Sequence, residues 1–323
     1  MTETVAGSPI WKPAPHRVPA PGLPTSVRVY EVGPRDGLQA ETKVIPTATK
    51  VEFIERLVTA GLRTVELTSF VSPRWIPQLA DAADLMGRLK LPDSVSTVVL
   101  VPNLTGLERA LAAGATEVAV FVSATEEFAK RNLNNTVDGA VSAAAQVIES
   151  ARALGLPVRA YISMCFGDPW EGAVPTSRVA DIARTLVDSG ATTLSLGDTI
   201  GIATPGHVLA LLDAIRERGI GIDTIAMHFH DTYGQALANV YAALTAGVSE
   251  FDSAAGGLGR CPYAKGATGN LATEDLVWML HGLGIDTGID LNALADASSW
   301  MAERIGHTSP ARVVNALRAA QRT

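Results

Sequence analysis

The chain contains 323 residues, of which 47% are hydrophobic and 18% charged, and its net charge at neutral pH is −7. This composition is typical of a globular protein with a large core, and the negative net charge argues against a duplex nucleic-acid partner, which requires a basic face. No apolar run reaches about 18 residues, so no transmembrane helix is predicted. The two cysteines, Cys165 and Cys261, lie far apart in the sequence. That spacing argues against a disulfide framework and favours a reducing, cytoplasmic environment.

The first 26 residues hold six of the eighteen prolines and have no apolar central region. They contain the acidic Glu3 and few arginines, so they resemble neither a secretory signal nor an organellar transit peptide. We expect residues 1–26 to form an extended or disordered arm that lies on the rest of the protein or on a partner subunit.

From residue 27 onward, short β-branched apolar runs alternate with longer helical patterns. The predicted strands are Val27–Val32, Thr64–Leu67, Ser96–Leu100, Glu117–Phe121, Val158–Ser163, Thr193–Leu196, Ile225–His230 and Glu250–Asp252. The clearest helical patterns are Pro46–Ala60, Val137–Leu154, Thr176–Ser189, a helix beginning at Thr204-Pro205, and Leu237–Ala246, most of them followed by a C-capping glycine.

Eight strand–helix units in a chain of this length predict a (β/α)8 TIM barrel over residues 27–290. An open doubly wound sheet is the alternative, but no G-x-G-x-x-G follows the first strand and the number of strands favours closure. The helical pattern over residues 291–323 predicts two more helices, which cap the barrel or contribute to a subunit interface.

In such a barrel, polar residues just past the strand C-termini gather at one face, where chemistry takes place. Arg35 and Asp36 follow the first strand, and a plain Pro/Gly turn with Asp36 as a local cap is an equally good interpretation. Glu66 and Asp198 come near the ends of the second and sixth strands. Each is either a carboxylate that orients Arg35 or a ligand, or a buried structural acid.

His228 and His230 end the seventh strand, and their i, i+2 spacing points both imidazoles to one face of the strand. A single histidine there would more often be structural, whereas this pair favours a metal site. Asn270 follows the eighth strand, although it could instead be a helix N-cap. Since strand eight of a closed barrel lies between strands seven and one, these three side chains and Asp36 can meet. One carboxylate, two imidazoles and an amide suit a divalent cation, with Mg²⁺ or Mn²⁺ favoured and Zn²⁺ possible.

Cys261 lies in a glycine-rich loop, residues 256–269, with Arg260 before it and Pro262 and Tyr263 after it. A lone cysteine is usually a buried small hydrophobe, but these neighbours do not form an apolar slot. The loop therefore indicates a thiol presented to a ligand. Residues 130–132 form another basic segment, after the fourth strand; a solvated charge cluster is favoured there over an anion site.

These motifs resemble the 3-hydroxy-3-methylglutaryl-CoA lyase family, metal-dependent barrels related to condensing enzymes. The matching segments are Gly33–Gln39, Thr68–Pro73, Ser195–Gly201, His230–Asn239 and Cys261–Asp275, within residues 27–290. The resemblance implies that metal is held by Asp36, His228, His230 and Asn270. It implies catalytic roles for Arg35 and Cys261, with Glu66, Asp198 and Glu274 in support, and His228 is a further candidate as a proton carrier.

The implied reaction is retro-Claisen cleavage of an acyl-CoA, 3-hydroxy-3-methylglutaryl-CoA, as in leucine catabolism. We expect the enzyme to be a homo-oligomer, with no nucleic-acid or membrane partner. Arg260 replaces the glycine usual before the family cysteine, so a related 3-hydroxy-3-alkylglutaryl-CoA is an alternative substrate. A 2-oxo-acid condensing synthase and a non-catalytic metal-binding barrel are weaker alternatives.

Overall fold

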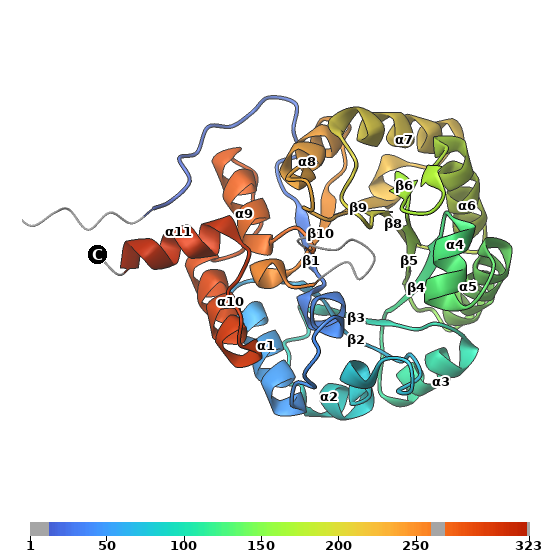
Figure 1. Cartoon of the computed structure of the whole chain (residues 1–323), viewed down its shortest axis with the longest axis horizontal. Helices are drawn as coiled ribbons and strands as arrows, with labels where there is room; N and C mark the ends of the chain where they lie inside the picture. The colour runs from blue at the N-terminus through green and yellow to red at the C-terminus, as the bar shows by residue number, and fades with distance from the viewer. Residues whose placement is uncertain (1–12, 260–268, 322–323) are drawn as a thin grey trace, which may run out of the picture.

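Eight parallel strands close into a barrel in the computed structural model, which describes residues 13–259 and 269–321. The barrel order is β1-β10-β9-β8-β5-β4-β3-β2, and every neighbouring pair is parallel. The barrel strands are β1 Arg28–Glu31, β2 Thr64–Ser69, β3 Ser96–Leu100, β4 Val118–Ser123, β5 Val158–Ser163, β8 Thr193–Asp198, β9 Ile225–Phe229 and β10 Glu250–Ser253. The predicted TIM barrel is therefore confirmed (Figure 1).

The helices form a ring outside the barrel (Figure 1). They are α1 Thr47–Thr59, α2 Ala82–Arg88, α3 Leu104–Ala112, α4 Glu126–Phe128, α5 Val137–Ala153, α6 Thr176–Asp188, α7 Pro205–Glu217, α8 Ala236–Thr245, α9 Thr273–Gly282, α10 Leu291–Ile305 and α11 Arg312–Gln321. Apolar side chains from the ring and from the outer strand faces make one continuous core. Gly61 follows the C-cap of α1 at φ +107°, where a Cβ atom would lie 2.3 Å from the carbonyl oxygen of Gly288. Only glycine fits this close approach.

The structure differs from the predicted elements in details near the cavity. β2 continues to Ser69, with an irregular register between Glu66 and Thr68. β9 ends at Phe229, because His230 leaves the strand to form an isolated bridge with Asn270. A two-stranded hairpin, β6 Gly167–Asp168 and β7 Gly172–Ala173, follows β5; strands of two residues are too short to give a sequence pattern.

The described part of the N-terminal segment, residues 13–26, lies along the end of α9. The Val18 N–H donates to the Gly282 carbonyl at 2.8 Å, and the Arg17 guanidinium donates to the Gly284 carbonyl at 2.7 Å. At the other end of the chain, α10 packs against α1 and α9, and α11 packs against α9 and α10 (Figure 1). Residues 13–26 and α11 therefore both contact the region around α9.

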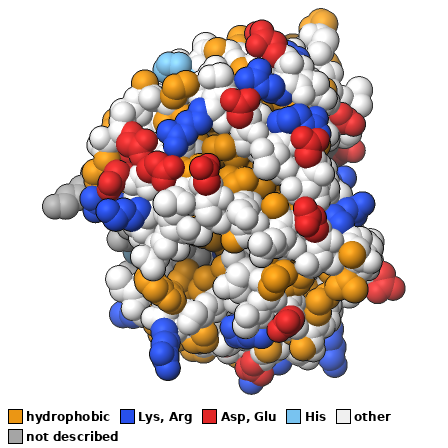
Figure 2. Space-filling model, turned by 90° about the vertical axis from the view of Figure 1, so that its right-hand side faces the viewer, with side chains coloured by type: hydrophobic (Ala, Val, Ile, Leu, Met, Phe, Trp, Pro, Cys, Tyr) orange, Lys and Arg blue, Asp and Glu red, His pale blue; other side chains and the backbone are white. Residues whose placement is uncertain are grey.

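The surface of the flank seen in Figure 2 carries acidic and basic side chains interspersed with hydrophobic ones. On α6 and α7, exposed arginines pair with aspartates one turn away, as in Arg184 with Asp188 and Arg216 with Asp213. None of the helices in the described part of the chain combines the length and apolar character that a bilayer crossing requires.

Candidate metal centre and active site

A single tight turn places Arg35 and Asp36 at the C-terminal mouth of the barrel. The N–H groups of Arg35, Asp36 and Gly37 all donate to the Val32 carbonyl, at 3.2, 2.8 and 3.1 Å, which forms one π-helical turn directly after β1. The Asp36 carboxylate does not cap this turn: it accepts hydrogen bonds from the Arg35 and Asn270 side chains instead. The turn therefore presents Asp36 to groups from other strands.

The Arg35 guanidinium is held by two carboxylates. Its Nε and Nη2 atoms both lie 2.8 Å from Oε2 of Glu66, and Nη1 lies 2.8 Å from Oδ1 of Asp36. Tyr161 donates to the same Glu66 oxygen at 3.2 Å. Burial alone would lower the Arg35 pKa, but Glu66 and Asp36 raise it above its ordinary value. The mouth thus contains a permanently charged guanidinium in a fixed orientation, with N–H donors left for a ligand.

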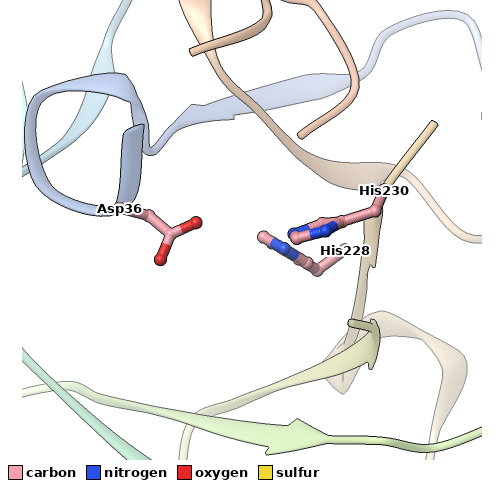
Figure 3. Close-up of side chains that lie close together, drawn as sticks. All are labelled: Asp36, His228 and His230. Carbon is pink, nitrogen blue, oxygen red and sulfur yellow. The ribbon is translucent and has the colours of Figure 1, made fainter. Parts of the chain in front are cut away.

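Asp36, His228 and His230 converge in space although they come from opposite ends of the sequence. One ligand atom from each lies within 4.8 Å of the others, and the two imidazole centroids are 5.2 Å apart. Figure 3 shows the Asp36 carboxylate facing both imidazoles. Among the described residues, this is the one group of three such side chains close enough to share a cation.

Asn270 completes the cluster from the segment after β10. Its Nδ2 atom donates to Oδ2 of Asp36 at 2.9 Å and to the Leu258 carbonyl at 3.0 Å. It is not the N-cap of α9, because that helix begins at Thr273 with Ala272 as its N-cap. The structure therefore brings all four predicted metal ligands together.

The donor set fits a divalent cation. Among the described residues, neither Oδ1 of Asn270 nor Nδ1 of His230 has a hydrogen-bond partner, although both atoms are buried. A buried polar atom without a partner is costly unless something binds it. Burial and the neighbouring His228 lower the His230 pKa to about 3, so this imidazole is neutral at physiological pH. Burial raises the Asp36 pKa, but Arg35 and His228 outweigh that effect and lower it to about 2. Both groups are thus in the deprotonated form that a metal ligand requires.

The remaining predicted acids lie around the mouth rather than in the cluster. Asp198 accepts the backbone N–H groups of Ile202 and Ala203, both at 3.0 Å, and so shapes the loop after β8. Glu274 accepts the Gly256 N–H and the Ser298 hydroxyl, away from the cavity, and therefore holds the start of the glycine-rich loop. Neither contacts Arg35, so among the predicted carboxylates Glu66 orients the guanidinium together with Asp36.

A cavity of about 980 Å³ opens over the cluster. Arg35, Asp36, His228 and His230 form part of its wall. Its other side is lined by apolar side chains, including Leu100, Pro102, Phe121, Phe128 and Ile162. This volume is at the upper end of the range for small-molecule and cofactor sites.

The HMGL-like family model matches residues 26–301. The chain belongs to this family. It is 46% identical over 314 residues to the cytoplasmic 3-hydroxy-3-methylglutaryl-CoA lyase of Rattus norvegicus, a match that covers 97% of this chain and 91% of the relative. The mitochondrial hydroxymethylglutaryl-CoA lyase of Gallus gallus is 47% identical, with 91% and 98% covered. The crystal structure of hydroxymethylglutaryl-CoA lyase from Pseudomonas aeruginosa aligns with a TM-score of 0.90 and 45% identity, over 92% of this chain and 99% of that one.

Two positions singled out by the family resemblance, Arg260 and Cys261, lie outside the described residues. The basic segment after β4 is described: Arg131 and Asn132 line the cavity. Arg131 is half exposed, donates to Glu127 at 3.1 Å and stacks on Trp170, with its guanidinium carbon 4.5 Å from a ring centroid.

Sequence reasoning missed two buried acids in this HMGL-like barrel. Glu31 accepts the N–H groups of Gly33 and Ala255, both at 2.8 Å, and so ties the turn that carries Asp36 to the loop after β10. Asp252 contacts His228 from inside the barrel. The signal was available, since each is an acid within a predicted barrel strand, and a buried acid must find a partner.

Proposed function

We propose that this chain catalyses the metal-dependent cleavage of 3-hydroxy-3-methylglutaryl-CoA to acetyl-CoA and acetoacetate, a step of leucine catabolism. The observation that carries the proposal is the meeting of Arg35 with Asp36, His228, His230 and Asn270 at the mouth of the barrel, in a member of a family whose relatives are these lyases. We also propose a homo-oligomer that acts in the cytoplasm, as the name of the Rattus norvegicus relative states for that protein.

We assign Asp36, His228, His230 and Asn270 as the ligands of Mg²⁺ or Mn²⁺. Two oxygen donors and two imidazoles favour these ions, which accept carboxylate and carbonyl ligands. The chemistry supplied by a bound cation is Lewis acidity, which lowers the pKa of the substrate's tertiary hydroxyl. Asn270 would bind through Oδ1, an atom that accepts no hydrogen bond from the described part of the chain.

The chain's own residues stabilise the negative charge that develops on the substrate and protonate the product. The tertiary hydroxyl loses its proton to water, the C2–C3 bond breaks, and its electron pair becomes the thioester enolate while C3 becomes the ketone of acetoacetate. Arg35, oriented by Glu66, donates N–H groups to the enolate oxygen; a preorganised donor of this kind is worth about 3–4 kcal/mol. Cys261 then delivers a proton to C2, which gives acetyl-CoA. Asp198 and Glu274 maintain the loops on either side.

The decisive experiment measures acetyl-CoA released from 3-hydroxy-3-methylglutaryl-CoA by the purified protein. We expect release that a chelator abolishes and that Mg²⁺ or Mn²⁺ restores. A panel of 3-hydroxy-3-alkylglutaryl thioesters, run in parallel, identifies the preferred acyl group. Cleavage only of a longer thioester would replace the substrate, condensation of acetyl-CoA with a 2-oxo acid would indicate a synthase, and metal binding without either reaction would indicate a non-catalytic barrel.

A further inference from the structure

The two imidazoles of the cluster are supported differently. His228 Nδ1 lies 3.1 Å from Oδ2 of Asp252, whereas Nδ1 of His230 has no hydrogen-bond partner within residues 13–259 and 269–321. Asp252 is on β10, next to β9 in the barrel, and its register places it directly beside His228. Its side chain is fully buried. Nothing in the family resemblance assigns this carboxylate a role.

Asp252 is itself fixed by two further donors inside the barrel. Oδ1 accepts from the Arg159 guanidinium, and Oδ2 accepts from the Ser195 hydroxyl at 2.8 Å. Arg159 is 2% exposed and is held in turn by Glu250 and by the ring of Tyr30, whose centroid is 4.0 Å from the guanidinium carbon. The carboxylate is therefore paired with a cation and cannot rotate without breaking contacts to two other strands.

We propose that Asp252 is a positioning residue that fixes the tautomer and the ring orientation of His228 in the candidate metal site. A carboxylate is an acceptor only, so the proton of the neutral imidazole resides on Nδ1 and the lone pair on Nε2 is directed at the cluster. An imidazole held in this way by a carboxylate is a better metal ligand. This proposal rests on the proposed function, in which His228 is a ligand of the metal.

A purely structural role for Asp252 makes a different prediction. If it served only to balance the charge of Arg159, its loss would lower the stability and leave the imidazole unaffected. Glu250 provides the matched comparison, because it also pairs with Arg159 from β10, two residues away, and its carboxylate is bound by Arg159 and Arg28 rather than by His228.

The first test uses the wild-type, metal-free protein labelled with ¹⁵N-histidine. Long-range ¹H–¹⁵N spectra at alkaline pH report which nitrogen carries the proton, and a His228→Asn variant assigns the signal among the six histidines. We expect the Nδ1–H tautomer for His228. An Nε2–H tautomer in the wild type would overturn the proposal, and this measurement depends neither on a folded Asp252 variant nor on catalysis.

The second test compares Asp252→Asn with Glu250→Gln. We expect D252N to shift His228 toward the Nε2–H tautomer and to weaken Mn²⁺ binding by roughly 10- to 100-fold, while E250Q leaves both close to wild type. Equal effects of the two variants on Mn²⁺ affinity, or an unchanged tautomer in folded D252N, would show that Asp252 only balances the charge of Arg159. Because both readouts are independent of turnover, failure to cleave the thioester would remove the proposed function and leave this result standing.

Discussion

The two sides of the cavity are built differently. On the side of β1, β2 and β9, charged groups are held by several hydrogen bonds each: Arg35 by Glu66 and Asp36, and Asp36 also by Asn270. On the side of β3, β4 and β5, apolar side chains such as Phe121 and Ile162 line the wall. The polar wall, which we define as Arg35, Asp36, His228 and His230, is therefore preorganised for charge, while the apolar wall supplies contact area.

Removing the carboxylate of the polar wall tests the comparison most severely. We expect Asp36→Ala to weaken Mn²⁺ binding at least about 100-fold and to abolish turnover, because the cluster loses its single anionic ligand. Isothermal titration calorimetry measures the affinity. Asp213→Ala, at an exposed position on α7, is the control and should bind Mn²⁺ like the wild type; unchanged affinity in D36A would exclude Asp36 as a ligand.

The Arg35 guanidinium should affect the reaction rather than the metal. We expect Arg35→Met to lower kcat by about 10²- to 10³-fold, with Mn²⁺ affinity changed far less than in D36A. Steady-state kinetics at saturating metal give kcat and KM separately. A variant with near-normal kcat would remove Arg35 from enolate stabilisation, whatever its effect on KM.

A substitution in the apolar wall should change KM rather than kcat. Phe121→Ala removes contact area that substrate and transition state share equally, so we expect KM to rise by up to about 10-fold and kcat to change little. The same kinetic assay measures both. If F121A lowered kcat as strongly as the Arg35 substitution, the division between the two walls would be wrong.

The smallest expected effect lies outside both walls, at Glu274. Burial raises its pKa from 4.5 to about 8. Between these values the unfolded chain ionises Glu274 while the folded chain keeps it protonated, so the folded state binds more protons and the free energy of unfolding falls as pH rises. Glu274→Gln removes this titration, and we expect a shallower decline between about pH 5 and about pH 8 in urea unfolding. If the free energy of unfolding fell with pH at the same slope in the wild type and in the variant, Glu274 would not titrate in this range.

The fold was predictable because the apolar runs and C-capping glycines alternate regularly, and a barrel needs little more than that alternation. The convergence of Asp36, His228, His230 and Asn270 was predictable for a related reason: strand order in a closed barrel places the seventh, eighth and first strands side by side. In each case a general rule about how strands are arranged was sufficient to make the prediction without coordinates.

The supporting contacts could not be predicted in this way. Glu31 accepts from a backbone N–H that is 224 residues away, and Asp252 reaches Arg159 across the interior of the barrel from a strand 93 residues away. Which strand face a side chain occupies follows from the register, and which donor it finds depends on rotamers that no short motif encodes. Sequence patterns therefore indicate where the candidate ligands meet, and only the structure shows which contacts hold them in place.

Anomalous diffraction from a crystal grown with Mn²⁺ tests the central claim most directly. The account predicts one strong peak bound by Asp36, His228, His230 and the Oδ1 atom of Asn270, at the mouth of the barrel beside Arg35. A peak held by other residues, or no peak at saturating Mn²⁺ in a protein that cleaves the thioester, would contradict the assignment of this cluster as the metal centre.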